Sequence, residues 1–316
     1  MACPGGCQGT TPRRGQKVSM KTFLKNYYRF IAIGILMLAG LSLLLYPLVA
    51  NIWNNHVQAQ LVNNYSESVT TAIEEGSLDV TAELERAEQY NEDLLPSILP
   101  DSFAEAEANG TDENYMSILN ANGDGIMGYI QIPSINVKLP IFHTTNEDVL
   151  QIGVGHLEGS SLPVGGPSTH SVLSAHRGLP SATLFTDLDK VEIGEDFFLI
   201  IMGEYYAYEI ESIDVVEPDD TSLLAVKDGE DLCTLITCTP YGVNTQRLMV
   251  TGHRVEYTPE LLEDAKTPAF GMVSLHSNYL LWVIVGLAIV ALFIVILYIY
   301  DKLRTKKEKT SEAEDN

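Results

Sequence analysis

Two uncharged apolar runs, one near each end of the chain, restrict what this sequence can fold into more than any other feature. Residues 30–49 and 279–300 contain no charged side chain over 20 and 22 positions. About 20 apolar residues are needed to cross a ~30 Å hydrocarbon layer at ~1.5 Å per residue. We therefore expect transmembrane helices over 30–50 and 279–300, with the intervening chain held at both ends.

The distribution of charge orients these two runs. Residues 1–50 carry six Lys and Arg and no acid, whereas residues 51–278 carry eight basic and 37 acidic side chains. Basic residues beside a span favour the cytoplasmic side, and five of them follow the second run. We expect a two-pass protein of the cell membrane, in contact with its lipid. The terminal segments 1–29 and 301–316 would be cytoplasmic and the acidic middle part extracellular.

The overall charge also excludes a class of partners. The chain has 316 residues and a net charge of −23, which argues against nucleic-acid binding because phosphate backbones require cationic side chains.

A cleaved signal peptide is the alternative interpretation of the first run. The run exceeds the ~7–15 apolar residues of a signal peptide, and no good small-residue cleavage site follows it, so a retained anchor is favoured. Cys3 and Cys7 lie in a leader rich in Gly and Pro that lacks two further zinc ligands. Met20 would also make an ordinary start for a membrane protein.

The acidic middle part begins with a helical pattern. Apolar side chains recur at every fourth position, and they are Val57, Leu61, Tyr65, Val69 and Ile73. This spacing predicts a helix with one apolar face, which Gly76 would end. A weaker stripe over 80–95 completes a helical hairpin. We expect a helical stalk over 51–95 and an acidic lid or linker loop over 96–127.

From residue 128 the pattern changes to short β-like segments separated by turn signals. The candidate strands are 128–142, 171–175, 196–202, 204–213, 233–238 and 247–255. Many short strands with little helix favour a closed barrel or a sandwich. We expect this β domain over 128–258, followed by a linker over 259–278.

One segment before the first strand imitates part of a calcium loop. It contains Asn120, Asn122, Asp124 and Gly125, but its first position is not Asp and its twelfth position is Gln131 instead of Glu. A turn is the better interpretation, and we expect neither a metal nor another cofactor.

Two cysteines, Cys233 and Cys238, lie in the part expected outside the membrane. On one strand they would be about 16 Å apart, whereas a disulfide requires Cα atoms within ~7 Å. We therefore expect two free thiols on opposite faces of the strand. Cys233 lies among apolar residues and should pack in a core. Cys238 ends the strand before a turn, which makes it the candidate nucleophile.

A thiol with a pKa near 8.5 needs a neighbouring base or cation to react at neutral pH. Arg247 follows Cys238 by nine residues, and a hairpin would bring both to one end of a sheet; a surface ion pair is its alternative role. The residues alone leave the histidine open, although His176 lies where a strand meets a Gly turn and His170 could support it. The other candidates are His143, His156 and His253, with Arg177 and Arg254 as further cations.

Residues 234–248, TLITCTPYGVNTQRL, resemble the signature of sortases, in which TLxTC precedes an Arg. Residues 153–166 and 169–190, with the two apolar runs, resemble class C sortases, the pilin polymerases of Gram-positive bacteria. The resemblance covers roughly residues 50–300. It implies a mainly β fold, an eight-stranded sortase β-barrel with an N-terminal helical hairpin and two flanking transmembrane helices.

By position, the resemblance implies that Cys238 is the nucleophile, His176 the general acid and base, and Arg247 the cation that binds substrate and oxyanion. His170 and Thr237 are expected to support them.

Class C sortases often carry a lid with an Asp-Pro-aromatic motif, and the matching residues here are Asp101, Ser102 and Phe103. We expect Asp101 to face the Arg and Phe103 to lie near the thiol. The missing Pro predicts a looser lid.

The function implied is cleavage of an LPxTG-like sorting motif between Thr and Gly, followed by transfer of the acyl group to a Lys of a pilin subunit. The expected partners are sorting-motif pilins or surface proteins and the acceptor pilin Lys. The alternatives are a transpeptidase that attaches single proteins to peptidoglycan, a non-catalytic membrane scaffold of pilus assembly, and a plain cysteine protease.

Overall fold

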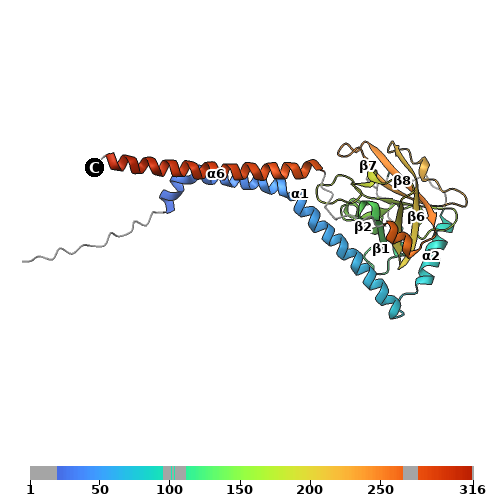
Figure 1. Ribbon diagram of the computed structural model, residues 1–316. Helices are drawn as coiled ribbons and strands as arrows, with labels where there is room; N and C mark the ends of the chain where they lie inside the picture. The colour runs from blue at the N-terminus through green and yellow to red at the C-terminus, as the bar shows by residue number, and fades with distance from the viewer. Residues whose placement is uncertain (1–19, 95–100, 102, 104–111, 266–276, 315–316) are drawn as a thin grey trace, which may run out of the picture. The chain divides into compact units, whose positions relative to one another are not determined.

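The structure is a computed structural model of the chain (Figure 1). It describes residues 20–94, 101, 103, 112–265 and 277–314. The leader with Cys3 and Cys7 and the central Ser102 of the lid motif lie outside the described residues. The chain divides into two units, Met1–Leu45 with Leu281–Asn316 and Tyr46–Leu280.

The first unit contains two helices that are long and apolar enough to cross a membrane. They are the N-terminal part of α1 (Met20–Glu74) and α6 (Ser277–Glu314), with mean hydropathies of 2.3 and 3.0 over their apolar stretches. Within this unit the helices are in contact, since a Cβ added at Gly286 would lie 3.0 Å from the side chain of Leu44. Both apolar runs are therefore helical.

The second unit is built on a closed barrel of eight strands, as expected from the resemblance. The strand order around the barrel is β1-β2-β3-β4-β7-β8-β6-β5. The strands are β1 (Ile126–Ile132), β2 (Val137–His143), β3 (Val154–His156), β4 (Thr169–Ser174), β5 (Asp196–Ile201), β6 (Glu204–Val216), β7 (Asp231–Thr239) and β8 (Gln246–Val255). Strand β3 was not predicted, because three residues are too short to show an alternating pattern.

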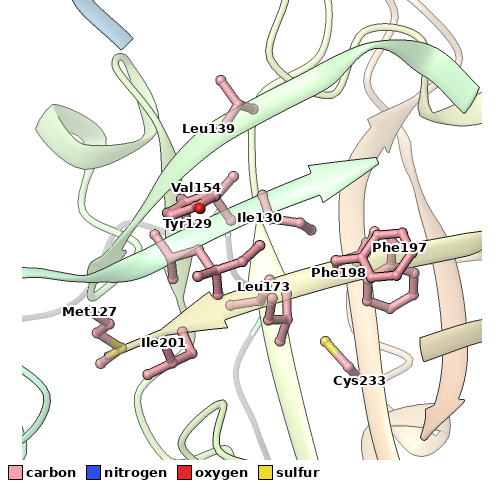
Figure 2. Packing of buried hydrophobic residues seen from close by; sticks show 14 of the residues in the cluster. Met127, Tyr129, Ile130, Leu139, Val154, Leu173, Phe197, Phe198, Ile201 and Cys233 are labelled. Atoms are coloured by element: carbon pink, nitrogen blue, oxygen red, sulfur yellow. The ribbon is translucent and has the colours of Figure 1, made fainter. Parts of the chain in front are cut away.

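Alternation of side chains across the strands creates the core. The interior cluster takes Leu173 from β4, Cys233 and Leu235 from β7, and Val250 from β8, and all four are fully buried. Figure 2 shows Leu173 and Cys233 with Phe197, Phe198 and other residues of this cluster. The expectation that Cys233 packs in a core is therefore confirmed. Cys233 and Cys238 are both free thiols.

The C-terminal part of α1 and α2 (Val80–Asp93) form the expected helical hairpin, and this hairpin packs on the barrel. The Tyr65 hydroxyl donates to the carbonyl of Met127 at 2.7 Å and accepts from the amide of Met202 at 2.9 Å. A single buried phenol thereby joins the helix to β1 and to the residue that follows β5.

The face that α1 buries differs in part from the predicted stripe. Val62, Tyr65 and Val69 are buried, whereas Ile73 is 45% exposed. A spacing of four residues turns 400°, so a strict four-residue stripe drifts by about 40° per step around a 3.6-residue helix. The helix ends at Glu74, next to the positive φ of +67° at Gly76.

Short helices occupy two segments that were expected to be loop or linker, α3 (Glu113–Ser117) and α5 (Pro259–Ala265), and a third, α4 (Glu147–Leu150), lies within the β domain. There are 3-10 turns at Pro133–Ile135, Leu188–Lys190 and Ser222–Leu224. Leu261 and Leu262 of α5 pack against the interior cluster, so the chain after β8 remains bound to the barrel.

The segment that imitates a calcium loop forms a turn before β1. The amide of Gly125 donates to Asn120 Oδ1 at 2.9 Å, and the amide of Ile126 donates to Asp124 Oδ1 at 3.1 Å. The side chains of Asn120 and Asp124 thus accept hydrogen bonds from nearby backbone amides.

A buried imidazole on β3 connects α3 to the barrel. His156 is fully buried, and its Nε2–H donates to the carbonyl of Ser161 at 2.8 Å. Its Nδ1 therefore accepts from the Tyr115 hydroxyl at 3.0 Å. Burial is the largest cause that lowers the pKa of His156 from 6.5 to about 4.

This depressed pKa predicts a loss of stability in mild acid. Between pH of about 6.5 and about 4 the unfolded chain binds a proton that the folded chain does not, so the free energy of unfolding falls as the pH falls. His156→Gln keeps a donor and an acceptor without titrating. It should flatten the slope by up to about 1.4 kcal/mol per pH unit. Denaturant unfolding followed by circular dichroism measures this, and equal slopes for variant and parent would contradict it.

Candidate active site

The paired ends of β7 and β8 bring Cys238 and Arg247 together. Strands β7 and β8 pair antiparallel, and Cys238 lies directly opposite Arg247 in their register. Pro240, which has no N–H, follows the strand directly. The hairpin expected from the nine-residue spacing is confirmed.

Both side chains belong to the outer face of the wall. Successive side chains of a strand point to opposite faces. Cys233 and Leu235 point into the barrel, so Ile236 and Cys238 point outward. The middle of this outer face is an apolar cluster of Leu157, Val172, Leu224, Ile236 and Met249. The face thus presents an apolar surface that ends at a thiol and a guanidinium.

Arg247 is held by a carboxylate from outside the barrel. Its Nε donates to Asp101 Oδ1 at 2.8 Å and its Nη2 to Asp101 Oδ2 at 2.5 Å. The side chains are 9% and 17% exposed, so this bidentate pair is largely shielded from water. The hydrogen bonds to Asp101 are the main cause that raises the pKa of Arg247 above its ordinary value. Asp101 therefore faces the Arg, as expected.

Phe103 covers the same end of the outer face. Its ring centroid lies 5.1 Å from Cζ of Arg247 and 5.6 Å from the ring centroid of His176. The ring also packs against the outer apolar cluster. Phe103 therefore bridges the two candidate site residues on either side of it.

His176 lies just past the end of β4. Strands β4 and β7 run parallel, and the last pair in their register is Ser174 with Ile236. Continued by two residues, this register would bring His176 next to Cys238 on the neighbouring segment. The amide of Phe185 donates to the carbonyl of His176 at 3.1 Å.

A carboxylate approaches the imidazole from α4. Oε2 of Glu147 lies 3.4 Å from Nε2 of His176, and the Glu147 side chain is 68% exposed. A hydrogen bond from Gln151 is the main cause that lowers the pKa of Glu147, and His176 contributes to the same shift.

The environment of Cys238 keeps its thiol protonated in this covered state. The residue is 8% exposed. Burial raises the pKa of the Cys238 thiol, the charge of Arg247 lowers it, and the charge of Asp101 raises it. The carboxylate that pairs with Arg247 thus also opposes formation of the thiolate.

The two residues expected in support have different positions. Thr237 is adjacent to Cys238, and its hydroxyl donates to the carbonyl of Ala175 at 2.8 Å, next to His176. His170 lies at the other end of β4, where Nδ1 contacts the carbonyl of Ala225 and Nε2 contacts the hydroxyl of Thr234. His170 is therefore separated from Cys238 by the length of the apolar cluster.

Among the residues that the structure describes, no three His, Cys, Asp or Glu side chains gather as metal ligands. The geometry instead offers a thiol, an imidazole and a guanidinium, which are the groups needed for acyl transfer through a cysteine.

Comparisons with known proteins agree with this arrangement. Residues 130–255 match the sortase domain model. Sortase C-1 from Actinomyces oris is 46% identical, with a TM-score of 0.54 over 56% of this chain and 98% of that chain. Sortase C from Streptococcus pneumoniae is 40% identical, with a TM-score of 0.55 over 63% of this chain and 98% of that chain. Sortase D from Bacillus subtilis is 34% identical over 131 residues, which are 40% of this chain and 63% of that protein.

A closed eight-stranded barrel that carries this site defines a sortase fold. The chain belongs to the sortase family, whose members are cysteine transpeptidases.

Two features near the site were not predicted from the sequence: the carboxylate of Glu147, and the contacts of Arg177 with Thr239 and Asp189. Glu147 precedes β3 in a helix of four residues and carries no local signal of its position. Arg177 follows His176 directly in the sequence, and this adjacency was the one sequence signal that Arg177 lies near the site.

Removal of Asp101 should make the Cys238 thiol more acidic. In Asp101→Ala, Arg247 retains its charge while the opposing carboxylate is lost, so the pH midpoint for alkylation of Cys238 by iodoacetamide should fall. A decrease of one pKa unit would raise the rate below the midpoint by about tenfold. Peptide mass spectrometry of the full chain in detergent distinguishes Cys238 from the other cysteines.

Asp220→Ala is the matched control for this measurement, because Asp220 is an exposed carboxylate bonded to Ser222. An unchanged or higher midpoint in Asp101→Ala would show that Asp101 does not control the thiol.

Proposed function

We propose that this protein is a class C sortase that builds covalent pili outside the cell. Its substrate is a secreted protein with an LPxTG-like sorting motif, and its acceptor is a Lys of a pilin subunit. The observation that carries the proposal is the position of Cys238 opposite Arg247, with Phe103 joining Arg247 to His176. The similarity to sortase C structures supports the class, and one of these structures is described in terms of pilin substrate specificity.

The first half-reaction forms a thioester. The Cys238 thiolate attacks the carbonyl carbon of the motif Thr, and Arg247 donates hydrogen bonds to the oxyanion. His176 takes the thiol proton when the thiolate forms, and it gives this proton to the departing Gly amine as the C–N bond breaks. The products are an acyl-enzyme on Cys238 and a released peptide with a free amino terminus.

The second half-reaction transfers the acyl group. The Nζ of a neutral acceptor Lys attacks the thioester, the C–S bond breaks, and the proton lost by nitrogen returns the enzyme to its starting state through His176. An isopeptide bond is formed. Water would give hydrolysis instead, so the site must favour the amine.

The covering residues must leave before substrate enters. Asp101 occupies the donors of Arg247 that the oxyanion requires, and Phe103 lies against the apolar surface beside them. In this proposal Asp101 and Phe103 belong to a lid, and the structure corresponds to the closed resting state.

The two apolar helices fit an anchor at each end of the enzyme. In the proposed topology both termini are cytoplasmic, and the barrel lies outside the cell. Sorting-motif substrates are themselves tethered to the membrane before transfer, so confinement to one surface raises the effective concentration of each for the other.

The two cysteines of β7 provide a direct test of the nucleophile. Cys238→Ala should abolish the covalent adduct with an LPxTG-type peptide and the pilin ladder in cells. Cys233→Ala, a change on the same strand but in the interior cluster, should retain both. Intact-mass spectrometry of the full chain detects the adduct. An adduct in Cys238→Ala, or normal ladders, would reject the assignment.

Loss of the guanidinium should impair acylation more than it impairs folding. Arg247→Gln is expected to lower kcat for thioester formation by about 10²–10³-fold, the usual effect of removing an oxyanion donor. Arg254→Gln removes a guanidinium that stacks on Tyr206 and should leave kcat within about twofold. Comparable rates for both variants would contradict the role of Arg247.

The linkage in the product separates pilus assembly from the alternative reaction. Mass spectrometry of cross-linked peptides from the cell surface should find the motif Thr joined to a pilin Lys. A Thr joined only to a wall-peptide amine would favour attachment of single proteins to peptidoglycan.

A further inference from the structure

His176 lies on a segment that the barrel's backbone ladder does not reach. The paired register of β4 and β7 ends at Ser174 and Ile236, and one further backbone bond follows, from the amide of Ala175 to the carbonyl of Ile236 at 3.2 Å. Beyond this point the segment around His176 needs other contacts to remain beside β7.

Two side-chain hydrogen bonds continue the register past the end of the ladder. Thr237 donates to the carbonyl of Ala175 at 2.8 Å, and Nη1 of Arg177 donates to the hydroxyl of Thr239 at 3.1 Å. Continued past Ser174 and Ile236, the parallel register of β4 and β7 predicts these pairs, Ala175 with Thr237 and Arg177 with Thr239. They bracket His176 on one segment and Cys238 on the other.

The guanidinium of Arg177 is itself fixed. Its side chain is 7% exposed, and Nη2 forms an ion pair with Asp189 of the 3-10 turn Leu188–Lys190. Its Nε is buried without a hydrogen-bond partner. Asp189 is 43% exposed, so water weakens this ion pair, and a buried N–H without a partner costs stability. Both facts point to a role of Arg177 in fixing geometry.

Close packing limits this segment further. Gly178 has a φ of +79°, and a Cβ added there would approach the ring of Tyr241 to 3.3 Å. The loop after β7 and the segment after His176 therefore touch, and any shift of one would displace the other.

We propose that Arg177 is a positioning residue for the transpeptidation described above. It links the residue after His176 to the residue after Cys238, and thereby holds the imidazole at the distance from the sulfur that proton transfer requires. This inference rests on the proposed function of Cys238 and His176. It assigns no chemical step to Arg177 itself.

The test measures thioester formation by the full chain in detergent, with rates expressed per Cys238 thiol titrated and at a temperature well below unfolding. Arg177→Met and Thr239→Val should each lower kcat by on the order of 10- to 100-fold, the usual effect of a displacement near 1 Å, with KM changed less than about threefold. The double variant should be no slower than Arg177→Met alone, because both changes break one bond. Arg177→Lys, which can still reach one partner, should recover part of kcat.

Arg254→Met is the matched control for a guanidinium lost from the same barrel. Its stacking partners are Tyr206 and Tyr208, so any effect should fall on the unfolding temperature and not on kcat per thiol. The pH profile of Cys238 alkylation should be the same in Arg177→Met as in the parent, because Arg247 and Asp101 are the charges that act on the thiol.

The outcomes separate this inference from the function on which it rests. If the parent protein forms no thioester, the proposed function fails. If the parent forms it and Arg177→Met retains kcat per thiol within about twofold, Arg177 is only structural. Additive losses in the double variant would also overturn the positioning role, because they would show that Arg177 and Thr239 act separately.

Discussion

The register of three neighbouring strands is the constraint on which the site depends. Antiparallel pairing places Arg247 opposite Cys238, and the parallel pairing of β4 with the other side of β7 ends two residues before His176. A slip by one residue in either pair would turn a reactive side chain toward the barrel interior. The interior packing of Leu173, Leu235 and Val250 prevents such a slip, because it would expose apolar side chains. The core therefore fixes the site.

Much of this arrangement could be predicted from the sequence. The parts that could not be predicted depend on contacts between residues that are far apart in the chain. Cys238 and Arg247 could be paired from their spacing, since a hairpin is a local structure. The odd separation of Cys233 and Cys238 gave each cysteine the correct face. The choice of His176 needed the family resemblance, because β4 pairs with β7 across an intervening stretch of more than fifty residues and parallel pairing leaves no local signal. The ring contacts of Phe103 depend on the same long-range fold.

Two buried guanidinium groups near the site pair with carboxylates from different parts of the chain, and these carboxylates are 43% exposed in Asp189 and 17% exposed in Asp101. Arg177 and Arg247 are almost equally buried, at 7% and 9% exposure. Asp189 belongs to the 3-10 turn Leu188–Lys190 between β4 and β5, and the neighbouring Leu188 is buried in the interior cluster. Asp101 lies before the first strand, and under the proposed function its pair with Arg247 belongs to a lid. Two guanidinium groups of the same chemistry thus act differently because their partners belong to different parts of the chain.

In the proposed reaction, departure of Asp101 frees Nε and Nη2 of Arg247, while Nη1 keeps its contacts with the carbonyls of Asn244 and Gln246. A guanidinium that has lost its carboxylate partner favours a new negatively charged acceptor. Under the proposed reaction, this acceptor is the oxygen of the substrate carbonyl, and its negative charge in the tetrahedral intermediate satisfies Arg247 better than the neutral ground state does. The same departure removes the charge that raises the pKa of Cys238. Under the proposed reaction, opening would therefore favour the thiolate and free the oxyanion donors in one event, so that the reactive thiolate forms when substrate can occupy the site.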